Sequence, residues 1–319
     1  MYQSETNYTI DLLINISDQI NRYFAIFIFI FGTCGNILNI VILSDRTLRH
    51  IPCVFLFLIA SISSLISIDL GLITRMLAGW ASDPTYTIGW ICKLRTFLVF
   101  ATRLIVFWLF VLSTIDRWLS SSVYNHQRRL NTMKNVRYAT LTVILMSVIM
   151  YAQLFYCYEA NLVRAPFPCY TKSSLCQIVT DLTFALFTII IPLLLMSMFS
   201  LMTIFNFHQS QQRIFRTGEQ RSKRTERYLL RMLCTQIIAL GLLTLPQAII
   251  RLYAAFVDMH HSELQTTIDM FVYNILLLLT YLASAMPFYI YTLTGGSLFR
   301  RPLSNLKQRI VQFFLRQTE

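Results

Sequence analysis

The sequence predicts an all-α membrane protein, a seven-transmembrane helix bundle followed by a short amphipathic C-terminal helix. Of its 319 residues, 55% are hydrophobic and only 13% are charged, with a mean hydropathy of +0.56. Soluble proteins usually carry about 25% charged residues. Apolar stretches of about 20 residues, long enough to cross a bilayer as helices, recur along the chain. They lack the period-two alternation of membrane β-strands, which favours helices over a barrel.

Seven spans are expected, at residues 21–44, 53–76, 90–115, 136–158, 179–206, 228–256 and 267–292. The stretch at 297–316 alternates apolar with basic side chains, which favours a helix along the membrane surface over a disordered basic tail. The expected organisation is therefore an N-terminal segment (1–20), a seven-span domain (21–295) and an amphipathic helix with a tail (296–319).

The 27 lysines and arginines are distributed unevenly between the two sets of loops. Most follow the first, third, fifth and seventh spans, and the positive-inside rule assigns these segments to the cytosol. The N-terminus is then extracellular, as expected for a multi-pass protein of the plasma membrane. Glycosylation sequons at Asn7 and Asn15 agree with this orientation. Because the basic residues lie between apolar spans, the lipid bilayer is an expected partner and nucleic acid is not.

An acid and a base, Asp116 and Arg117, directly follow the third span at its cytosolic end, and Trp118 comes next. Ionisable groups at the end of a membrane helix indicate either a function or an interfacial anchor, in which the arginine extends toward the headgroups. The triplet therefore needs the context of the other spans before a role can be assigned to it.

Seven spans, an extracellular N-terminus and an Asp-Arg-aromatic triplet ending span three resemble the rhodopsin-like G-protein-coupled receptors. The resemblance covers about residues 21–316. Further landmarks occur in family order, namely Gly35-Asn36 in span one, Cys92 at the start of span three, Glu226 before span six, and Pro192, Pro246 and Pro287 in spans five, six and seven. The chain looks most like divergent peptide receptors of invertebrates, near the FMRFamide-type receptors.

The resemblance implies that Arg117 pairs with Asp116 and Glu226 at rest and meets a heterotrimeric G protein on activation. It also implies that the three prolines act as helix hinges.

A disulfide from the start of span three to the second outer loop is a further implication of the resemblance. It would join Cys92 to Cys169, which is preferred, or to Cys176. If Cys169 is used, Cys176 is free or pairs with Cys157.

Several positions depart from the family pattern. Ser63 stands near the span-two aspartate, Met286 precedes Pro287 where the family has asparagine, and Thr244 occupies the position of the span-six tryptophan. We therefore expect neither a sodium site nor the usual tryptophan switch.

Candidate ligand-binding residues lie in the outer halves of the spans. Arg103 is deep in span three, where it would hold a carboxylate or carbonyl of a ligand. A structural ion pair between Arg103 and Asp69 of span two is an equally good interpretation. Gln247 and Arg251 lie four residues apart, hence on one face of span six, and Asp181 lies at a corresponding depth in span five. Solvated helix-end charges are the simpler interpretation of Asp181 and Arg251.

The expected function is a cell-surface receptor that binds an extracellular peptide or small molecule and activates a heterotrimeric G protein. A neuropeptide is favoured over an amine because the outer half of span three contains Arg103 and no acid. The alternatives are a seven-span transporter and a membrane protein that does not signal. A transporter would need several intramembrane acids, of which Asp69 alone is plausible. His260, His261 and Glu263 form the only His–acid cluster, so no enzyme, metal site or cofactor is expected.

Overall fold

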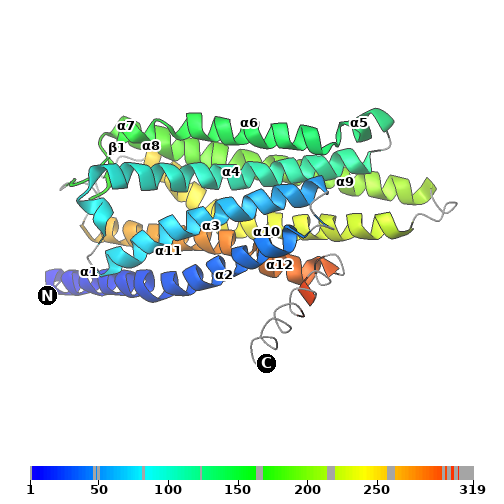
Figure 1. The fold of residues 1–319 in the computed structure, drawn as a ribbon. Coiled ribbons are helices and arrows are strands. Elements are labelled where there is room, and N and C mark those ends of the chain that lie inside the picture. The colour runs from blue at the N-terminus through cyan, green and yellow to red at the C-terminus, as the bar shows by residue number, and fades with distance from the viewer. Residues whose placement is uncertain are drawn as a thin grey trace, which may run out of the picture.

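The structure, a computed structural model, describes residues 2–45, 48, 51–80, 83–122, 124–162, 168–213, 220–256, 263–296, 299, 303–304 and 308, and the side chains of all these except 2–5, 125, 208–213 and 220–226. These residues form an elongated bundle of helices (Figure 1). Seven helices are long and apolar enough to cross a membrane. The chain is thus a multi-pass membrane protein with a seven-helix bundle, which confirms the expected fold class.

The long elements are α1 (Tyr2–Gln19), a π-helical turn η1 (Ile20–Phe24), α2 (Ala25–Leu43), α3 (Pro52–Gly79), α4 (Gly89–Ser121), α6 (Met133–Tyr151), α8 (Ser174–Leu182), a π-helical segment η3 (Thr183–Ile190), α9 (Ile191–Arg213), α10 (Gln220–Phe256) and α11 (Glu263–Ala285). The shorter elements are the 3-10 turn η2 (Pro84–Tyr86), α5 (Asn125–Leu130), α7 (Leu154–Cys157), β1 (Tyr158–Glu159), β2 (Tyr170–Thr171) and α12 (Pro287–Thr294). The two strands pair antiparallel.

Helix α4 is the most deeply buried of the seven spans and packs against α3, α6 and α9. Apart from Arg103 and a few hydroxyl side chains, its sequence is apolar on all sides between Phe97 and Ile115, as expected for a helix surrounded by other helices. Figure 1 shows α4 running along the bundle. We call the end of the bundle that contains Cys92 the disulfide end and the opposite end, which contains Arg117, the Arg117 end.

The N-terminal segment is helical, whereas the sequence predicted no helix at residues 1–20. Helix α1 continues through η1 into α2, and α1 packs against α11. Half-buried residues recur every three or four positions, including Ile10, Leu13 and Ser17, which gives α1 one face for this contact. Asn7 and Asn15 lie exposed on α1, and their glycosylation stays a prediction.

Two helices differ from their expected bounds in ways that affect the candidate site. Helix α4 continues to Ser121, so Asp116 and Arg117 lie inside its final turns rather than beyond its end. The expected seventh span is divided, because α11 ends at Ala285 and α12 begins at Pro287, which has no backbone N–H to continue the hydrogen-bond ladder. Most of the expected amphipathic helix, 297–316, lies outside the described residues.

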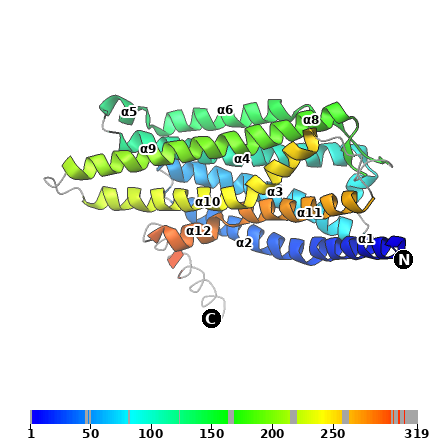
Figure 2. The same ribbon diagram turned by 180° about the vertical axis from the view of Figure 1, so that it is seen from behind.

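The other two candidate hinge prolines lie within continuous helical segments. Pro192 is the second residue of α9 and follows the π-helical turns of η3. Pro246 lies inside α10. Figure 2 shows α10 running beside α9 at the Arg117 end and turning toward α8 at the disulfide end. Such a change of direction is the usual consequence of an internal proline. Whether the three prolines act as hinges stays a prediction.

Candidate functional site

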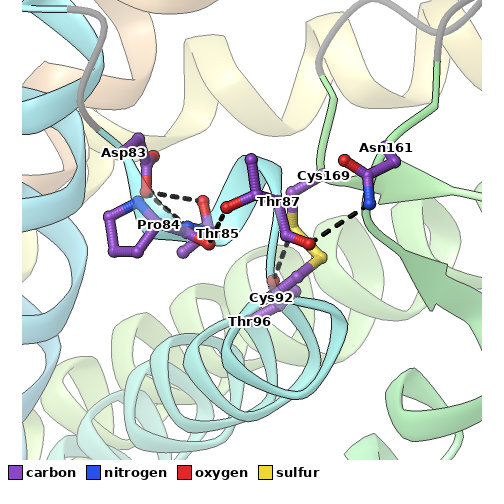
Figure 3. Close-up of a disulfide and its surroundings, with 8 residues drawn as sticks. All are labelled: Asp83, Pro84, Thr85, Thr87, Cys92, Thr96, Asn161 and Cys169. Atoms are coloured by element: carbon purple, nitrogen blue, oxygen red, sulfur yellow. Dashed lines mark hydrogen bonds between the residues drawn. A yellow bond between two sulfur atoms is a disulfide. The ribbon is translucent and has the colours of Figure 1, made fainter.

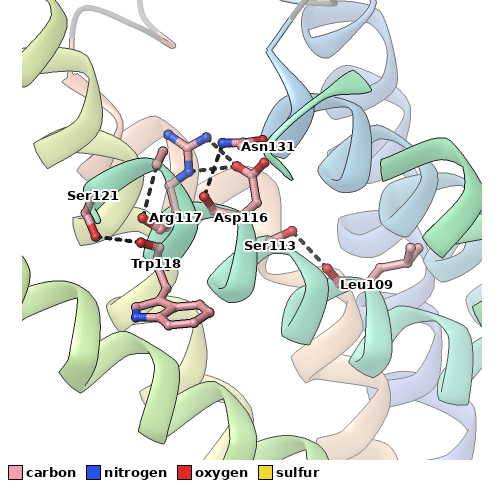
Figure 4. Close-up of polar contacts among 8 residues, drawn as sticks. Leu109, Ser113, Asp116, Arg117, Trp118, Ser121 and Asn131 are labelled. Atoms are coloured by element: carbon pink, nitrogen blue, oxygen red, sulfur yellow. Dashed lines mark hydrogen bonds and ion pairs between the residues drawn. The ribbon is translucent and has the colours of Figure 1, made fainter. Parts of the chain in front are cut away.

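At the Arg117 end, Asp116 and Arg117 form a buried ion pair (Figure 4). Nε of Arg117 donates to Oδ2 of Asp116 at 3.0 Å, and Nη2 also contacts that oxygen. The residues are only 3% and 7% exposed. The backbone oxygen of Asp116 accepts a hydrogen bond from Asn131, at 3.3 Å. Removing either charge would leave the other one buried and unpaired, which is costly. The two side chains therefore favour the paired, closed arrangement.

Neighbouring contacts join α4 to α9 at this end. Trp118 points away from the ion pair, and its ring centroid lies 5.5 Å from that of Phe199 (Figure 4). Asn206 of α9 donates to the hydroxyl of Ser121 at 3.4 Å. Glu226 lies in α10, but its side chain is outside the described residues, so its expected contact with Arg117 stays a prediction.

At the disulfide end, Cys92 in the first turn of α4 is bonded to Cys169, with the two Cα atoms 5.8 Å apart (Figure 3). This is the partner that the resemblance favoured. Asn161 strengthens the connection by donating from its backbone N–H to the oxygen of Tyr86 at 3.0 Å, and from its side chain to the oxygen of Thr87 at 3.2 Å. The chain between α3 and α4 is therefore joined to the β1–β2 hairpin.

Cys176 forms a second disulfide, with Cys157, whose Cα lies 5.4 Å away. The sequence left open whether Cys176 is free or paired, and in the structure it is paired with Cys157. The bond joins the end of α7 to the first turns of α8, while the paired strands lie between these helices in the sequence. Two covalent links thus fix the hairpin to three helices, α4, α7 and α8.

A cavity lies beneath the hairpin, between α3, α4, α10 and α11. Its volume is about 70 Å³, or about 680 Å³ if all the space between the lining atoms and the open solvent is counted. Tyr158 and Tyr170 of the hairpin line it. Four arginines also line it, namely Arg75 of α3, Arg95 and Arg103 of α4, and Arg251 of α10. The cavity is therefore strongly cationic, in the region where the sequence suggested a ligand site.

Arg103 is 5% exposed and lines this cavity, but Asp69 is not its partner. The carboxylate of Asp69 accepts a hydrogen bond from the hydroxyl of Thr33 at 3.0 Å. The guanidinium of Arg103 instead lies over the ring of Tyr281, 4.1 Å from its centroid. The interpretation of Asp69 and Arg103 as an ion pair is wrong, because Asp69 faces α2 whereas Arg103 faces α11.

Asp181 and Arg251 form a buried ion pair, which corrects their interpretation as solvated charges. Nη1 of Arg251 donates to Oδ1 of Asp181, and Nη2 donates to the hydroxyl of Tyr273 at 2.7 Å. The guanidinium also lies 4.5 Å from the ring centroid of Phe184. The bend of α10 toward α8 accounts for this burial, because it brings the outer part of α10 against α8 and η3.

Gln247 is fully buried, and within the described part of the chain neither its amide oxygen nor its amide nitrogen has a hydrogen-bond partner. It does not line the cavity. The structure therefore places Gln247 within the packed bundle and gives no support to its expected direct contact with a ligand.

The sequence did not indicate the other side chains that define this site. Arg75 and Arg95 lie near helix ends, where arginines commonly extend toward the membrane surface, so their inward position could not be inferred. Tyr86 and Tyr170 also line the cavity. Burial raises the pKa of both hydroxyls, so they are neutral and contribute no negative charge.

Gly71 of α3 supports the floor of the cavity by its close contact with Tyr281. A methyl group on Gly71 would lie 2.1 Å from the Tyr281 hydroxyl oxygen, so the ring beneath Arg103 would have to move. We expect Gly71→Ala to lower the free energy of unfolding by about 1–3 kcal/mol. Thermal denaturation of the purified protein checks this.

Gly241→Ala is the matched control, because the same methyl group on α10 would meet only Leu245, at 4.0 Å. It should leave stability unchanged or raise it slightly, since alanine is the better helix former. Equal effects of the two substitutions would contradict the close packing of Gly71 and Tyr281.

Among the described residues, no group of three or more His, Cys, Asp or Glu side chains could hold a metal ion. His260 and His261 lie outside the described residues. The sequence matches no model of a known protein family and no curated protein. The geometry offers two features on one helix, a cationic cavity at the disulfide end of α4 and a buried ion pair at its other end.

Proposed function

We propose that the protein is a cell-surface G-protein-coupled receptor of the plasma membrane, with its N-terminus and disulfide end outside the cell. The observation that supports this is the placement of two sites at opposite ends of α4. A cavity beneath a disulfide-linked hairpin suits a ligand from outside, and a buried ion pair at the other end suits a switch that a cytosolic partner can detect. That partner would be a heterotrimeric G protein.

Helix α10 provides a physical route between the two ends. It contributes Arg251 to the cavity, contains Pro246, and packs against α9 and α4. A ligand that favours a different position of Arg251 would shift α10 as a whole. The Asp116–Arg117 pair would then lose its closed surroundings and expose Arg117 to the G protein.

A neuropeptide is the expected ligand class. The cavity opens between four helices and is bordered by the hairpin, so a chain end can enter while the rest of the peptide contacts the outer surface. An amine is disfavoured because Asp83, the acid that lines the cavity among the described residues, already accepts two hydrogen bonds from Thr85 at 2.8 Å each.

The proposal is tested by G-protein activation in cells. A panel of peptides, both amidated and with free carboxyl ends, is applied to cells expressing the full chain, and calcium and cyclic AMP are recorded. Any ligand that gives a response is then applied to the Arg117→Ala variant at equal surface expression. We expect a loss of at least tenfold in signalling, because the exposed arginine is the proposed contact with the G protein.

Arg137→Ala is the matched control, since Arg137 lies exposed near the start of α6. It should keep the response. A response that survives in Arg117→Ala would contradict the switch, and the absence of any response across the panel, with the protein at the cell surface, would favour a membrane protein that does not signal.

A further inference from the structure

The cavity contains more cationic groups than the described acids neutralise. Asp181 pairs with Arg251, and Asp83 is bonded to Thr85. Asp69 faces α2 and bonds to Thr33. Among the described residues, no acid pairs with Arg95 or Arg103, although both lie on the face of α4 that lines the cavity. Buried cations without counter-charges are costly, so an anion in the cavity would be bound favourably.

Arg103 has the geometry to bind such an anion. Its Nε and Nη2 atoms are buried and have no hydrogen-bond partner in the described part of the chain. These two nitrogens form one edge of the planar guanidinium, which is the fork that binds both oxygens of a carboxylate. The ring of Tyr281 covers one face of the Arg103 guanidinium, with its centroid 4.1 Å from Cζ. This contact uses the face of the guanidinium and does not use the N–H donors at its edge.

Arg95 extends the positive field from Arg103 toward the mouth. It lies two turns from Arg103 and close to Cys92, where the hairpin is attached. Its Nη2 donates to the oxygen of Gly71 at 3.2 Å, whereas its Nε is buried with no partner among the described residues. Arg95 therefore adds attraction for an entering anion, while Arg103 lies deeper, at the end of the path.

The surroundings of Arg103 also suit an apolar or aromatic body attached to the anion. Phe100, Val99 and Leu277 line the cavity together with Tyr281 and Tyr273. Aromatic rings of this kind pack against flat apolar groups in offset or edge-to-face arrangements. The recognised chemistry is therefore a carboxylate next to an apolar or aromatic group.

We propose that the ligand inserts a carboxylate, either the free C-terminus of a peptide or the acid group of a small organic molecule, between Arg103 and the aromatic side chains. This inference rests on the proposed function, because it specifies the ligand of the same site. It predicts that an amidated peptide, whose C-terminus has no negative charge, binds this site more weakly than the free acid.

The test uses pairs of probes that differ only in the charge of one group. The peptide pair is Ala-Leu-Phe with a free carboxyl end and Ala-Leu-Phe-amide, and the small-molecule pair is 3-phenylpropionate and 3-phenylpropionamide. Binding to the purified full chain in lipid nanodiscs is measured from the concentration dependence of its thermal denaturation. We expect at least one acid to bind about ten to a hundred times more tightly than its amide.

The variants assign this preference to a particular side chain. Arg103→Gln should abolish it, and Arg103→Lys, which keeps the charge but not the fork, should reduce it severalfold. Arg137→Gln, which removes an exposed arginine elsewhere, should leave it intact. Because Arg103→Gln removes an unpaired buried charge, its unliganded denaturation temperature should not fall, which separates loss of binding from loss of folding.

Each outcome supports or overturns the proposal. Preference for the peptide acid or for the small acid supports the carboxylate site and distinguishes the two ligand sources. Equal binding of acids and amides, no binding of any acid, or a preference that survives in Arg103→Gln overturns it. Carboxylate binding without G-protein activation would support the carboxylate site and contradict the receptor proposal. Signalling by amides alone would support the receptor proposal and contradict the carboxylate site.

Discussion

Asp181→Asn is expected to lower the free energy of unfolding by about 3 kcal/mol, because it removes the negative charge that faces Arg251. Both residues are buried, with Asp181 7% and Arg251 6% exposed. The amide oxygen of asparagine can still accept a hydrogen bond, so the effect should lie near the lower end of the usual range for breaking a buried pair, about 3–5 kcal/mol. Thermal denaturation of the purified protein measures the change.

Two further variants separate charge loss from other effects. Asp269→Asn is the matched control, because this carboxylate accepts a hydrogen bond from Gln265 at 3.1 Å in exposed surroundings, and it should change stability by less than about 0.5 kcal/mol. The double variant Asp181→Leu/Arg251→Met should recover most of the lost stability, since no buried charge remains unpaired. If Asp181→Asn changes the free energy of unfolding as little as Asp269→Asn does, the buried ion pair between Asp181 and Arg251 is contradicted.

Removal of the Cys92–Cys169 disulfide, by changing both residues to serine, is expected to lower stability by about 2–5 kcal/mol. The bond joins residues 77 positions apart, so its loss gives the unfolded chain much additional freedom. It also releases the hairpin from α4. We therefore expect weaker ligand binding together with a lower denaturation temperature.

The second disulfide provides the comparison. Cys157 and Cys176 are only 19 positions apart, so chain entropy predicts that their double serine variant loses about 1 kcal/mol less than the Cys92–Cys169 variant. The two variants have the same chemistry and lie in the same region of the protein. A larger loss from the Cys157–Cys176 variant would show that local packing, rather than loop closure, sets the contribution of these bonds.

The seven-helix bundle was predictable because membrane insertion acts on local sequence. Each span needs about 20 apolar residues whose backbone groups bond within the helix, and this requirement is visible without any neighbour. The chemistry of Arg103 was also recognisable, since a single arginine in a long apolar stretch is unusual wherever it points. Helix α1 was missed because its apolar face is narrow and its composition is polar, so the contact with α11 was needed to reveal its role.

Ion pairing, in contrast, depended on which faces of the helices meet. Asp69 and Arg103 lie at depths that allow a pair, yet they face different helices. Asp181 and Arg251 are 70 residues apart and meet because α10 turns toward α8. Hydropathy gives the depth of a residue in the membrane, but rotation about the helix axis is set by packing between helices.

The sequence by itself thus determined the membrane class, the number of spans, and the presence of an acid–base pair at Asp116 and Arg117. Only the tertiary structure decided which cations share a cavity and which acids neutralise them. The physical reason is that burial of an apolar helix is a property of its own residues, whereas electrostatic pairing requires two side chains within a few ångströms. In this protein that requirement joins Arg251 to Asp181 and leaves Nε and Nη2 of Arg103 without a hydrogen-bond partner among the described residues.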